Sequence, residues 1–390
     1  MSTSYWLDRT NPTNKKNYDV VIVGAGISGL STAYWLNQED PSLKIAIVEK
    51  NRLGFGASGR NAGFVTCGSV EHFNRLISKH GQAEALEIWR FAETNLKLLQ
   101  EHIIGDQGSS IEFYKRGAYS LAAQDNEFNE LKTVAKTMTT LDIPVEIFSS
   151  TEIEKNVGAT NFVGGIKYLD DAETNPFLLM ELMRTKIKAD IFELTEAHNY
   201  LQTSEGTRIL KTDNGDFECS MIIYSLNGYS PSIHPYFEDK IYATRAQILM
   251  MEKAPLFMDG PCYANFYLDY FRQMPNGALL IGGFRQLEKA TEVGYSDHIT
   301  PVIQNALHDF VKNHLPTLKD KPVSHRWGGI MGFSKDGQPM IGSLPTDGQV
   351  FFNGGYTGHG LGLAFHTGKR LVDLIFGRDV PAWLSARRFS

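Results

Sequence analysis

A strand–turn–helix–strand pattern near the amino terminus constrains this chain more than any other feature. Residues 18–24 (YDVVIVG) form a continuous apolar run rich in β-branched residues, which is typical of a strand buried on both faces. A glycine turn and a helical segment at residues 28–36 follow, and a second apolar run covers residues 44–49. Two buried strands joined by a helix predict a βαβ unit within a parallel sheet.

The turn of this unit, residues 24–29, has the sequence GAGISG, which is a GxGxxG pattern. Gly24 permits a tight turn, Gly26 lets the backbone approach a pyrophosphate, and Gly29 lets the helix pack closely on the strand. The helix N-terminus offers free N–H groups to the phosphates, and Glu49 can accept hydrogen bonds from both ribose hydroxyls. The pattern therefore predicts a dinucleotide site rather than a plain glycine turn. The expected contacts are Gly24, Gly26, Ile27, Ser28, Gly29, Glu49 and Lys50.

The segment at residues 52–68 (RLGFGASGRNAGFVTCG) bears on which dinucleotide binds, since NAD and FAD share the glycine turn. Small residues surround Arg60 and Asn61, so this segment can run close against a flat cofactor and direct polar groups at its phosphates or ring edge. A flexible surface loop is the alternative interpretation. The expected cofactor contacts are Ala57, Ser58, Arg60, Asn61, Ala62 and Gly63.

The second half of the chain has a different pattern. Short strands are expected at residues 243–252, 264–271 and 278–284, and a Pro-Asn-Gly turn separates the last two. Thr300 and Pro301 are expected to open a helix as its cap and first-turn proline. An antiparallel sheet with helices is therefore expected beside the parallel nucleotide fold, as an insertion into it.

Composition excludes several classes of protein. Lys and Arg number 38 against 44 Asp and Glu, and the resulting net charge of −6 argues against a nucleic-acid partner. No apolar run is long enough to span a membrane, and residues 1–17 resemble a polar arm rather than a secretory signal. Three scattered cysteines fit a reducing cytoplasm and give no metal site, and the histidines show no metal-ligand spacing.

Six blocks of sequence together resemble the D-amino-acid oxidase superfamily of FAD enzymes, which contains glycine oxidase, sarcosine oxidase and γ-glutamylputrescine oxidase. The block RLGFGASGRNAGF is most similar to the γ-glutamylputrescine oxidase branch. The resemblance covers nearly the whole chain and implies a non-covalent FAD. The blocks lie at residues 19–36, 52–64, 170–183, 221–231, 325–342 and 353–377.

The resemblance also implies a division into domains. The fold is expected to be α/β, with a Rossmann-like FAD-binding domain and an inserted antiparallel-sheet α+β substrate domain. The FAD domain is expected to comprise residues 1–80, 155–235 and 325–390. The substrate domain is expected to comprise residues 81–154 and 236–324.

The carboxyl-terminal glycine turn is where the resemblance puts the flavin's pyrimidine edge. A helix N-terminus there can stabilise the negative charge that reduced flavin gains. We therefore expect flavin contacts from this turn and from two glycines in other blocks. They are Gly358, His359, Gly360 and Leu361, with Gly228 and Gly329.

The sequence departs from its relatives at a position that matters for the substrate. Glycine oxidase and D-amino-acid oxidase hold the substrate α-carboxylate with an arginine where this chain has Met331. A thioether cannot replace a bidentate guanidinium fork. The difference favours an amine, a polyamine conjugate, or a carboxylate held elsewhere, for example by Arg60, Arg245 or Arg272. A cysteine that carries the flavin in monomeric sarcosine oxidase is also absent from the Ile330–Met331 block. Cys67 remains a candidate for a reactive or flavin-linked thiol, although a small buried side chain is the simpler interpretation.

Candidate active-site residues follow from the expected roof of the site. Tyr270 and Arg272 alternate on one predicted strand and should face the same side. The expected catalytic residues are His359, Tyr270 and Arg272. The expected substrate contacts are Tyr242, Arg245, Tyr267 and Met331.

The resulting prediction is FAD-dependent oxidation of an amine C–H bond, with hydride transfer to the flavin and hydrolysis of the imine. The substrate is expected to be a small-molecule amine or polyamine conjugate, and O2 the electron acceptor. The alternatives are a glycine, sarcosine or D-amino-acid oxidase, a hydroxy-acid oxidase, a dehydrogenase with another acceptor, and a flavoprotein without turnover. The sequence leaves the oligomeric state open.

Overall fold

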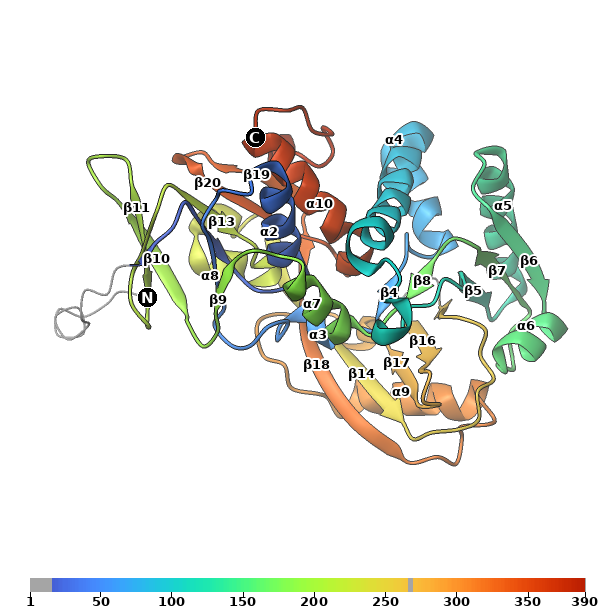
Figure 1. Ribbon diagram of the computed structural model, residues 1–390. Coiled ribbons are helices and arrows are strands. Elements are labelled where there is room, and N and C mark those ends of the chain that lie inside the picture. The colour runs from blue at the N-terminus through green and yellow to red at the C-terminus, as the bar shows by residue number, and fades with distance from the viewer. Residues whose placement is uncertain (1–15, 266–268, 390) are drawn as a thin grey trace.

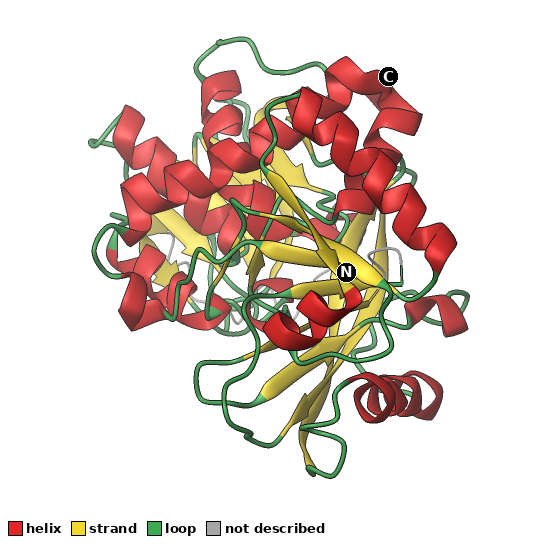
Figure 2. Cartoon of the chain, turned by 90° about the vertical axis from the view of Figure 1, so that its right-hand side faces the viewer, coloured by secondary structure: helices red, strands yellow, loops and turns green. Residues whose placement is uncertain are grey.

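Two large β-sheets organise the computed structural model, which describes residues 16–265 and 269–389 (Figures 1 and 2). The first sheet has six strands in the order β19-β20-β13-β2-β3-β9, all parallel to their neighbours except β19. Their bounds are Met340–Leu344, Asp347–Gly354, Met221–Tyr224, Val20–Val23, Ile45–Val48 and Asp190–Phe192. The chain from β2 through helix α2 (Ile27–Glu39) to β3 confirms the predicted βαβ unit.

Both faces of this sheet are buried, as its apolar strands predict. Ile22 and Ile47 face one core, shared with α2, α4 and α10. Val21 and Val48 face the other core, shared with the small sheet β1-β12-β11-β10. Alternate residues of a strand point to opposite faces, so two covered faces require a continuous apolar run.

The remaining elements of this half surround the sheet. The strands of the small sheet are Lys16–Asn17 (β1), Phe217–Cys219 (β12), Arg208–Thr212 (β11) and Ala197–Gln202 (β10). The helices are α3 (Ala57–Arg60), α4 (Val70–Leu99), α7 (Pro176–Thr185), α8 (Ser230–Ile233) and α10 (Gly360–Ile375). A π-turn, Gln100–Ile104, extends α4, and a two-stranded pair joins β4 (Phe64–Val65) to β8 (Ala172–Glu173).

The second large sheet has eight strands in the order β18-β14-β17-β16-β15-β5-β7-β6, and only β15 and β5 pair in parallel. Helix α9 (Pro301–His314) covers one face, and α5 (Asp125–Thr140) and α6 (Ser150–Val157) lie near β6 and β7 (Figure 1). The strands are Val323–Ser334, Ile241–Met251, Leu279–Gly282, Asp269–Gln273, Cys262–Ala264, Ala118–Ala122, Gly164–Tyr168 and Val145–Ser149.

Most expectations for this sheet are confirmed, and two need correction. The Pro-Asn-Gly turn joins the antiparallel strands β16 and β17. The single strand expected at residues 264–271 is instead two strands, β15 and β16, which pair with each other. Thr300 precedes α9 but does not cap it with its side chain; its hydroxyl accepts from the Gln247 amide at 3.0 Å and donates to Glu288 at 2.6 Å instead.

The predicted mixed α/β class is confirmed, whereas the predicted domain division stays a prediction. Two strands of the eight-stranded sheet, β7 and β18, lie wholly or largely within segments that the prediction gives to the FAD domain. The polar arm expected at residues 1–17 falls mostly outside the described residues.

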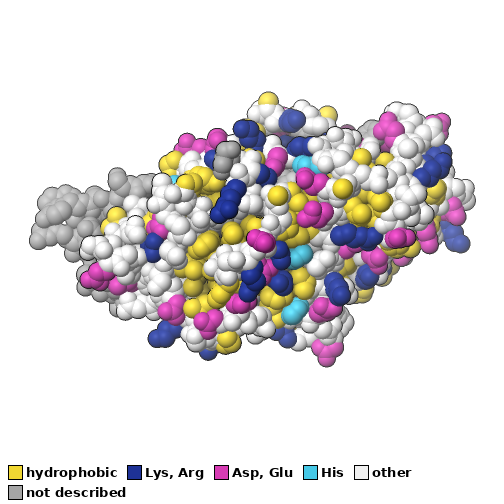
Figure 3. Space-filling view, turned by 90° about the horizontal axis from the view of Figure 1, so that it is seen from above, with side chains coloured by type: hydrophobic (Ala, Val, Ile, Leu, Met, Phe, Trp, Pro, Cys, Tyr) yellow, Lys and Arg dark blue, Asp and Glu magenta, His cyan; other side chains and the backbone are white. Residues whose placement is uncertain are grey.

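The surface mixes charges of both signs. Seen from above, basic and acidic side chains lie next to one another, with hydrophobic atoms between them (Figure 3). On α10, for example, Asp373 accepts from Arg370 at 2.8 Å and from Arg378 at 2.9 Å. Among the described helices, none combines the length and apolar character that a membrane crossing needs.

Candidate functional site

The glycine turn lies where the strand order of the six-stranded sheet changes direction, between β2 and β13. Ligands of open α/β sheets bind at such a point, beyond the carboxyl ends of the strands. Gly24 has a φ of +109°, and a Cβ added to it would lie 2.7 Å from the Ser225 carbonyl oxygen. A Cβ on Gly29 would lie 2.0 Å from the Gly24 carbonyl oxygen, so no larger residue fits.

The start of α2 is left open on the side of this turn. Gly26 precedes the helix without a side-chain cap, and the Ile27 N–H donates to the Ser58 hydroxyl at 2.9 Å. Ser28 points the other way, with its hydroxyl 2.6 Å from both Asn353 and Tyr356. The helix dipole and the Ser58 hydroxyl thus face the same turn.

Glu49 connects the turn to the end of β3. One carboxylate oxygen accepts from the Ala25 N–H and the other from the Asn51 N–H, each at 2.9 Å. Burial raises the pKa of this carboxyl group. Each oxygen keeps a second lone pair, so both can still accept from a ligand hydroxyl. Lys50 is exposed and pairs with Glu196 at 2.9 Å.

One further polar atom lies beside the glycine turn, in the crevice at the carboxyl ends of β2 and β13. The Ser225 hydroxyl follows β13, is buried, and has no hydrogen-bond partner within the described part of the chain. A buried hydroxyl normally finds a partner, so an unsatisfied one beside Gly24 suits a bound polar ligand.

The small-residue segment folds back on itself through Asn61. Its amide nitrogen donates to the carbonyls of Ala57 and Ser58, and its amide oxygen accepts from the Gly63 N–H at 2.7 Å. Ala62 is buried. These bonds consume the polar atoms of Asn61, which therefore shapes the segment rather than reaching outward.

Arg272, on β16, supports the same segment. The Arg272 guanidinium donates to Glu173 at 3.1 Å and to the Thr174 carbonyl at 2.8 Å, and Arg116 is a second partner of Glu173. The side chains of Arg272 and Glu173 are each 1% exposed. A Cβ on Gly63, which has a φ of +77°, would lie 2.1 Å from the Thr174 oxygen. Arg272 is therefore occupied by an internal ion pair.

Three aromatic rings meet at the end of this segment. Phe64 makes edge-to-face contacts with Tyr263 and Tyr270, with ring centroids 5.3 and 5.8 Å apart. The Tyr263 hydroxyl bonds to the Thr66 hydroxyl at 2.6 Å. The sequence singled out Tyr270 but not Phe64 or Tyr263, although Phe64 ends the RNAGF motif. The predicted contact Tyr267 lies outside the described residues.

The carboxyl-terminal turn meets β18 at Met331. A Cβ on Gly358 would lie 3.7 Å from the Met331 sulfur, and a Cβ on Gly228 would lie 2.8 Å from the Met331 carbonyl oxygen. Gly329, two residues earlier on the same face of β18, packs against Arg60. The structure thus brings together predicted residues from four distant segments.

His359 lies at the start of α10, beside Gly360 and the buried Leu361. Its Nδ1 is 3.0 Å from the Thr357 carbonyl, and its ring stacks on His72 with centroids 4.4 Å apart. Burial lowers the pKa of both histidines, so both are neutral at pH 7. The sequence predicts no partner for His359, because no local signal pairs residues so far apart in sequence.

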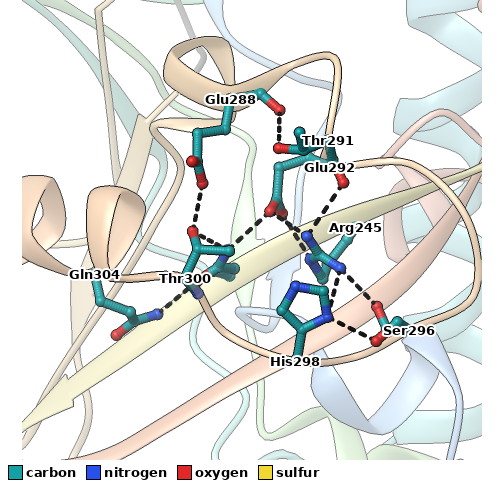
Figure 4. A network of polar contacts seen from close by, with 9 residues as sticks. Arg245, Glu288, Thr291, Glu292, Ser296, His298, Thr300 and Gln304 are labelled. Atoms are coloured by element: carbon teal, nitrogen blue, oxygen red, sulfur yellow. Dashed lines mark hydrogen bonds and ion pairs between the residues drawn. The ribbon is translucent and has the colours of Figure 1, made fainter.

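The other predicted substrate contacts lie elsewhere. Arg245 is 1% exposed, and Glu292 accepts from it at 2.5 and 3.0 Å (Figure 4). Tyr242 is about half exposed and packs on Phe333. Because the Arg245 charge is already neutralised by a buried carboxylate, its guanidinium is not available to a substrate.

Cys67 lies near the end of the small-residue segment and is buried. Its backbone N–H donates to Asp171 at 2.9 Å. Burial, followed by the charge of Asp171, raises the pKa of its thiol, so the reactive thiolate is disfavoured. In residues 16–265 and 269–389, no cluster of His, Cys, Asp and Glu has the geometry to hold a metal ion.

Comparison with known proteins assigns these features to a family. The profile of the FAD dependent oxidoreductase family matches residues 19–374. A probable oxidoreductase OrdL from Haemophilus influenzae is 25% identical, over 96% of this chain and 88% of the relative. The γ-glutamylputrescine oxidoreductase of Escherichia coli is 22% identical, over 92% of this chain and 84% of the relative.

Solved structures share the fold. The glycine oxidase of Geobacillus kaustophilus superposes with a TM-score of 0.79 at 20% identity, over 94% of this chain and 96% of that one. The L-proline dehydrogenase of P. horikoshii superposes with a TM-score of 0.80 at 18% identity, over 96% and 98% of the two chains.

Proposed function

This chain belongs to the family of FAD-dependent oxidoreductases, and from that premise we propose that it oxidises the C–H bond beside nitrogen in an amine or polyamine conjugate. The amine loses a hydride and a proton to become an imine, which water hydrolyses to a carbonyl compound and a smaller amine. O2 takes up the two electrons and two protons and becomes hydrogen peroxide. The observation that carries the choice of substrate is Met331, which stands where the resemblance places the carboxylate-binding arginine of the amino-acid oxidases.

The residues present fit FAD. Glu49 can bind the adenosine ribose, and the open N-terminus of α2 with the Ser58 hydroxyl suits the pyrophosphate. The unpartnered Ser225 hydroxyl and the close contact at Gly26, where a Cβ would lie 2.8 Å from Ser58, mark the same crevice. When bound, FAD supplies the two-electron acceptor for the oxidation.

The chain's own groups then orient the amine and manage its protons. The Phe64, Tyr263 and Tyr270 rings offer an apolar, aromatic wall to an alkyl amine. His359 is neutral at pH 7, and its Nδ1 donates to the Thr357 carbonyl, which leaves Nε2 as an acceptor for the proton that an ammonium substrate must lose. The N-terminus of α10 favours negative charge at the same turn.

Two further observations support an amine over an α-amino acid. Arg245 and Arg272 are the buried arginines of the predicted roof, and both are neutralised by glutamates, at 2.5 and 3.1 Å. Neither can act as a substitute for the missing arginine without breaking a buried ion pair.

The three cysteines are all buried and free, which fits a reducing compartment, and we include a cytoplasmic location in the proposal.

Anaerobic bleaching of the flavin's visible band tests the proposal. The panel pairs glycine, sarcosine and D-alanine with putrescine, spermidine and γ-glutamylputrescine. We expect the amines alone to bleach the flavin, and air to restore the band quickly. Slow recovery in air would instead indicate a dehydrogenase, and bleaching by no compound would indicate a flavoprotein without turnover.

Restoring the arginine provides the matching variant. Met331→Arg should let glycine or D-alanine bleach the flavin, with a gain in kcat/KM of about tenfold or more, because a charge-assisted fork contributes about 1.5–3 kcal/mol. Met331→Leu keeps an apolar side chain of similar volume and should leave the amino acids inactive. Rapid bleaching of the unmodified enzyme by amino acids would contradict the role given to Met331.

A further inference from the structure

Residues 289–299 form a strap that leads from the turn Arg285–Glu288 to α9. One end of the strap is fixed to β14. The Arg245 N–H donates to the Glu292 carbonyl and the Gly294 N–H donates to the Ala243 carbonyl, both at 3.0 Å. The Arg245–Glu292 ion pair, with side chains 1% and 0% exposed, reinforces this attachment.

The other end of the strap returns to the same strand (Figure 4). The Arg245 guanidinium lies 3.1 Å from His298 Nδ1 and donates to the Ser296 carbonyl at 3.0 Å. Next to the strap, the Thr300 N–H donates to the Gln247 amide oxygen at 2.9 Å. An arginine can only donate, so His298 Nδ1 is an acceptor here. Both ends therefore rest on buried groups of β14.

The tip of the strap, residues 295–297, makes contacts of another kind. The Tyr295 ring stacks on Tyr229, with centroids 5.5 Å apart and planes 25° apart. Asp297 accepts from Arg60 at 2.6 Å, and the Arg60 guanidinium lowers the pKa of that carboxyl group. Tyr295 is 46% exposed and the Asp297 side chain 59% exposed. The side chains of Tyr295 and Asp297 are thus held by two solvent-exposed contacts, whereas the backbone between them stays on Arg245 through the Ser296 carbonyl.

These two partners lie on two segments that border the dinucleotide crevice. Tyr229 follows β13, four residues after Ser225, and Arg60 follows Ser58 in α3. The Ser58 hydroxyl accepts from the Ile27 N–H and the Ser225 carbonyl lies against Gly24, so the segments that carry Arg60 and Tyr229 both border the glycine turn. The tip therefore bridges the mouth of the crevice.

We infer that the strap retains the bound dinucleotide, with Tyr295 and Asp297 as positioning residues that act through Tyr229 and Arg60. Exposed contacts break more readily than buried ones, so the Tyr295 and Asp297 side chains can swing away from Tyr229 and Arg60 while the strap backbone stays on β14. Their movement frees the border of the crevice for the cofactor to enter or leave. The inference concerns cofactor retention and does not depend on which amine is oxidised.

Release of FAD from the holoenzyme tests this inference without any substrate. The rise of free-flavin fluorescence after dilution gives the dissociation rate. We expect Asp297→Asn to raise the rate about threefold and Tyr295→Ala about fivefold, in line with an exposed ion pair and an aromatic stack. The double variant should release FAD roughly tenfold faster or more, while Tyr295→Phe keeps the stack and stays near the wild-type rate.

A matched control separates retention from general loss of stability. Asp309 is an exposed aspartate on α9 that pairs with Lys312 at 4.0 Å, away from the crevice. Asp309→Asn should leave the dissociation rate unchanged. Wild-type rates in Asp297→Asn and Tyr295→Ala would overturn the inference, as would an equal acceleration in Asp309→Asn or in Tyr295→Phe.

Discussion

The glycine turn and the small-residue segment face the same crevice, yet they are held in opposite ways. The turn is built from residues close in sequence, because Gly29 packs on the Gly24 carbonyl and Glu49 binds the Ala25 N–H. The segment is held by residues more than 100 positions away, since the Gly63 carbonyl accepts from the Thr174 N–H and Arg272 holds Thr174 in place.

This difference sets what each region can tolerate. Steric fit fixes the conformation of the turn, so an added atom there damages it. Buried charge stabilises the Gly63 part of the segment, because Arg272 and Glu173 stabilise it only while each neutralises the other. A variant at Gly29 should therefore act through packing, and a variant at Glu173 through charge.

Breaking the buried Arg272–Glu173 ion pair is the strongest test of this difference between the two regions. Glu173→Gln leaves Arg272 buried without a countercharge, and loss of one partner from such a pair costs about 3–5 kcal/mol. We expect a large fall in the free energy of unfolding, measured in denaturant, together with loss of the fixed Gly63 conformation.

The control for this test is Glu205→Gln, which removes an exposed carboxylate at a hairpin turn and should change stability by less than about 0.5 kcal/mol. If Glu173→Gln were equally mild, the segment would not depend on its distant support, and the contrast with the glycine turn would disappear.

Adding a side-chain atom to the glycine turn should cause the next largest loss of stability. Gly29→Ala puts a Cβ 2.0 Å from a backbone oxygen that cannot move aside, which we expect to cost about 2–3 kcal/mol. The variant should also retain little flavin per chain. Gly56→Ala is the matched control, because no atom lies within 4 Å of its added Cβ. Equal melting temperatures and flavin content in the two variants would contradict the steric account.

The same contrast explains what could be predicted from the sequence. The βαβ unit and the role of Gly29 follow from local periodicity and spacing, because the residues that decide them are neighbours. Tyr270 and Arg272 could be assigned to one side of a strand by alternation, and both contact the small-residue segment, at Phe64 and Gly63.

What could not be predicted is the pairing of distant charges and rings. An arginine on a predicted roof strand suggests a substrate contact, but only the fold reveals that Glu292 and Glu173 already neutralise Arg245 and Arg272. The stack of His72 on His359 is of the same kind. These partners meet through tertiary packing, which leaves no periodic trace in the sequence.

The His72–His359 stack gives the smallest expected effect and tests a third region, the start of α10. Burial lowers the pKa of His72 well below that of an unfolded histidine, with further lowering from His359, Arg75 and His80. The unfolded chain then binds more protons, so stability is complete above about pH 6.5 and falls as the pH drops below that value.

His72→Phe keeps a stacking ring but cannot titrate, and it should reduce the slope of unfolding free energy against pH by at most about 1.4 kcal/mol per pH unit. An unchanged slope in His72→Phe would mean that His72 already titrates normally in the folded protein, and that the start of α10 is as open to solvent as the strap tip rather than as closed as the glycine turn.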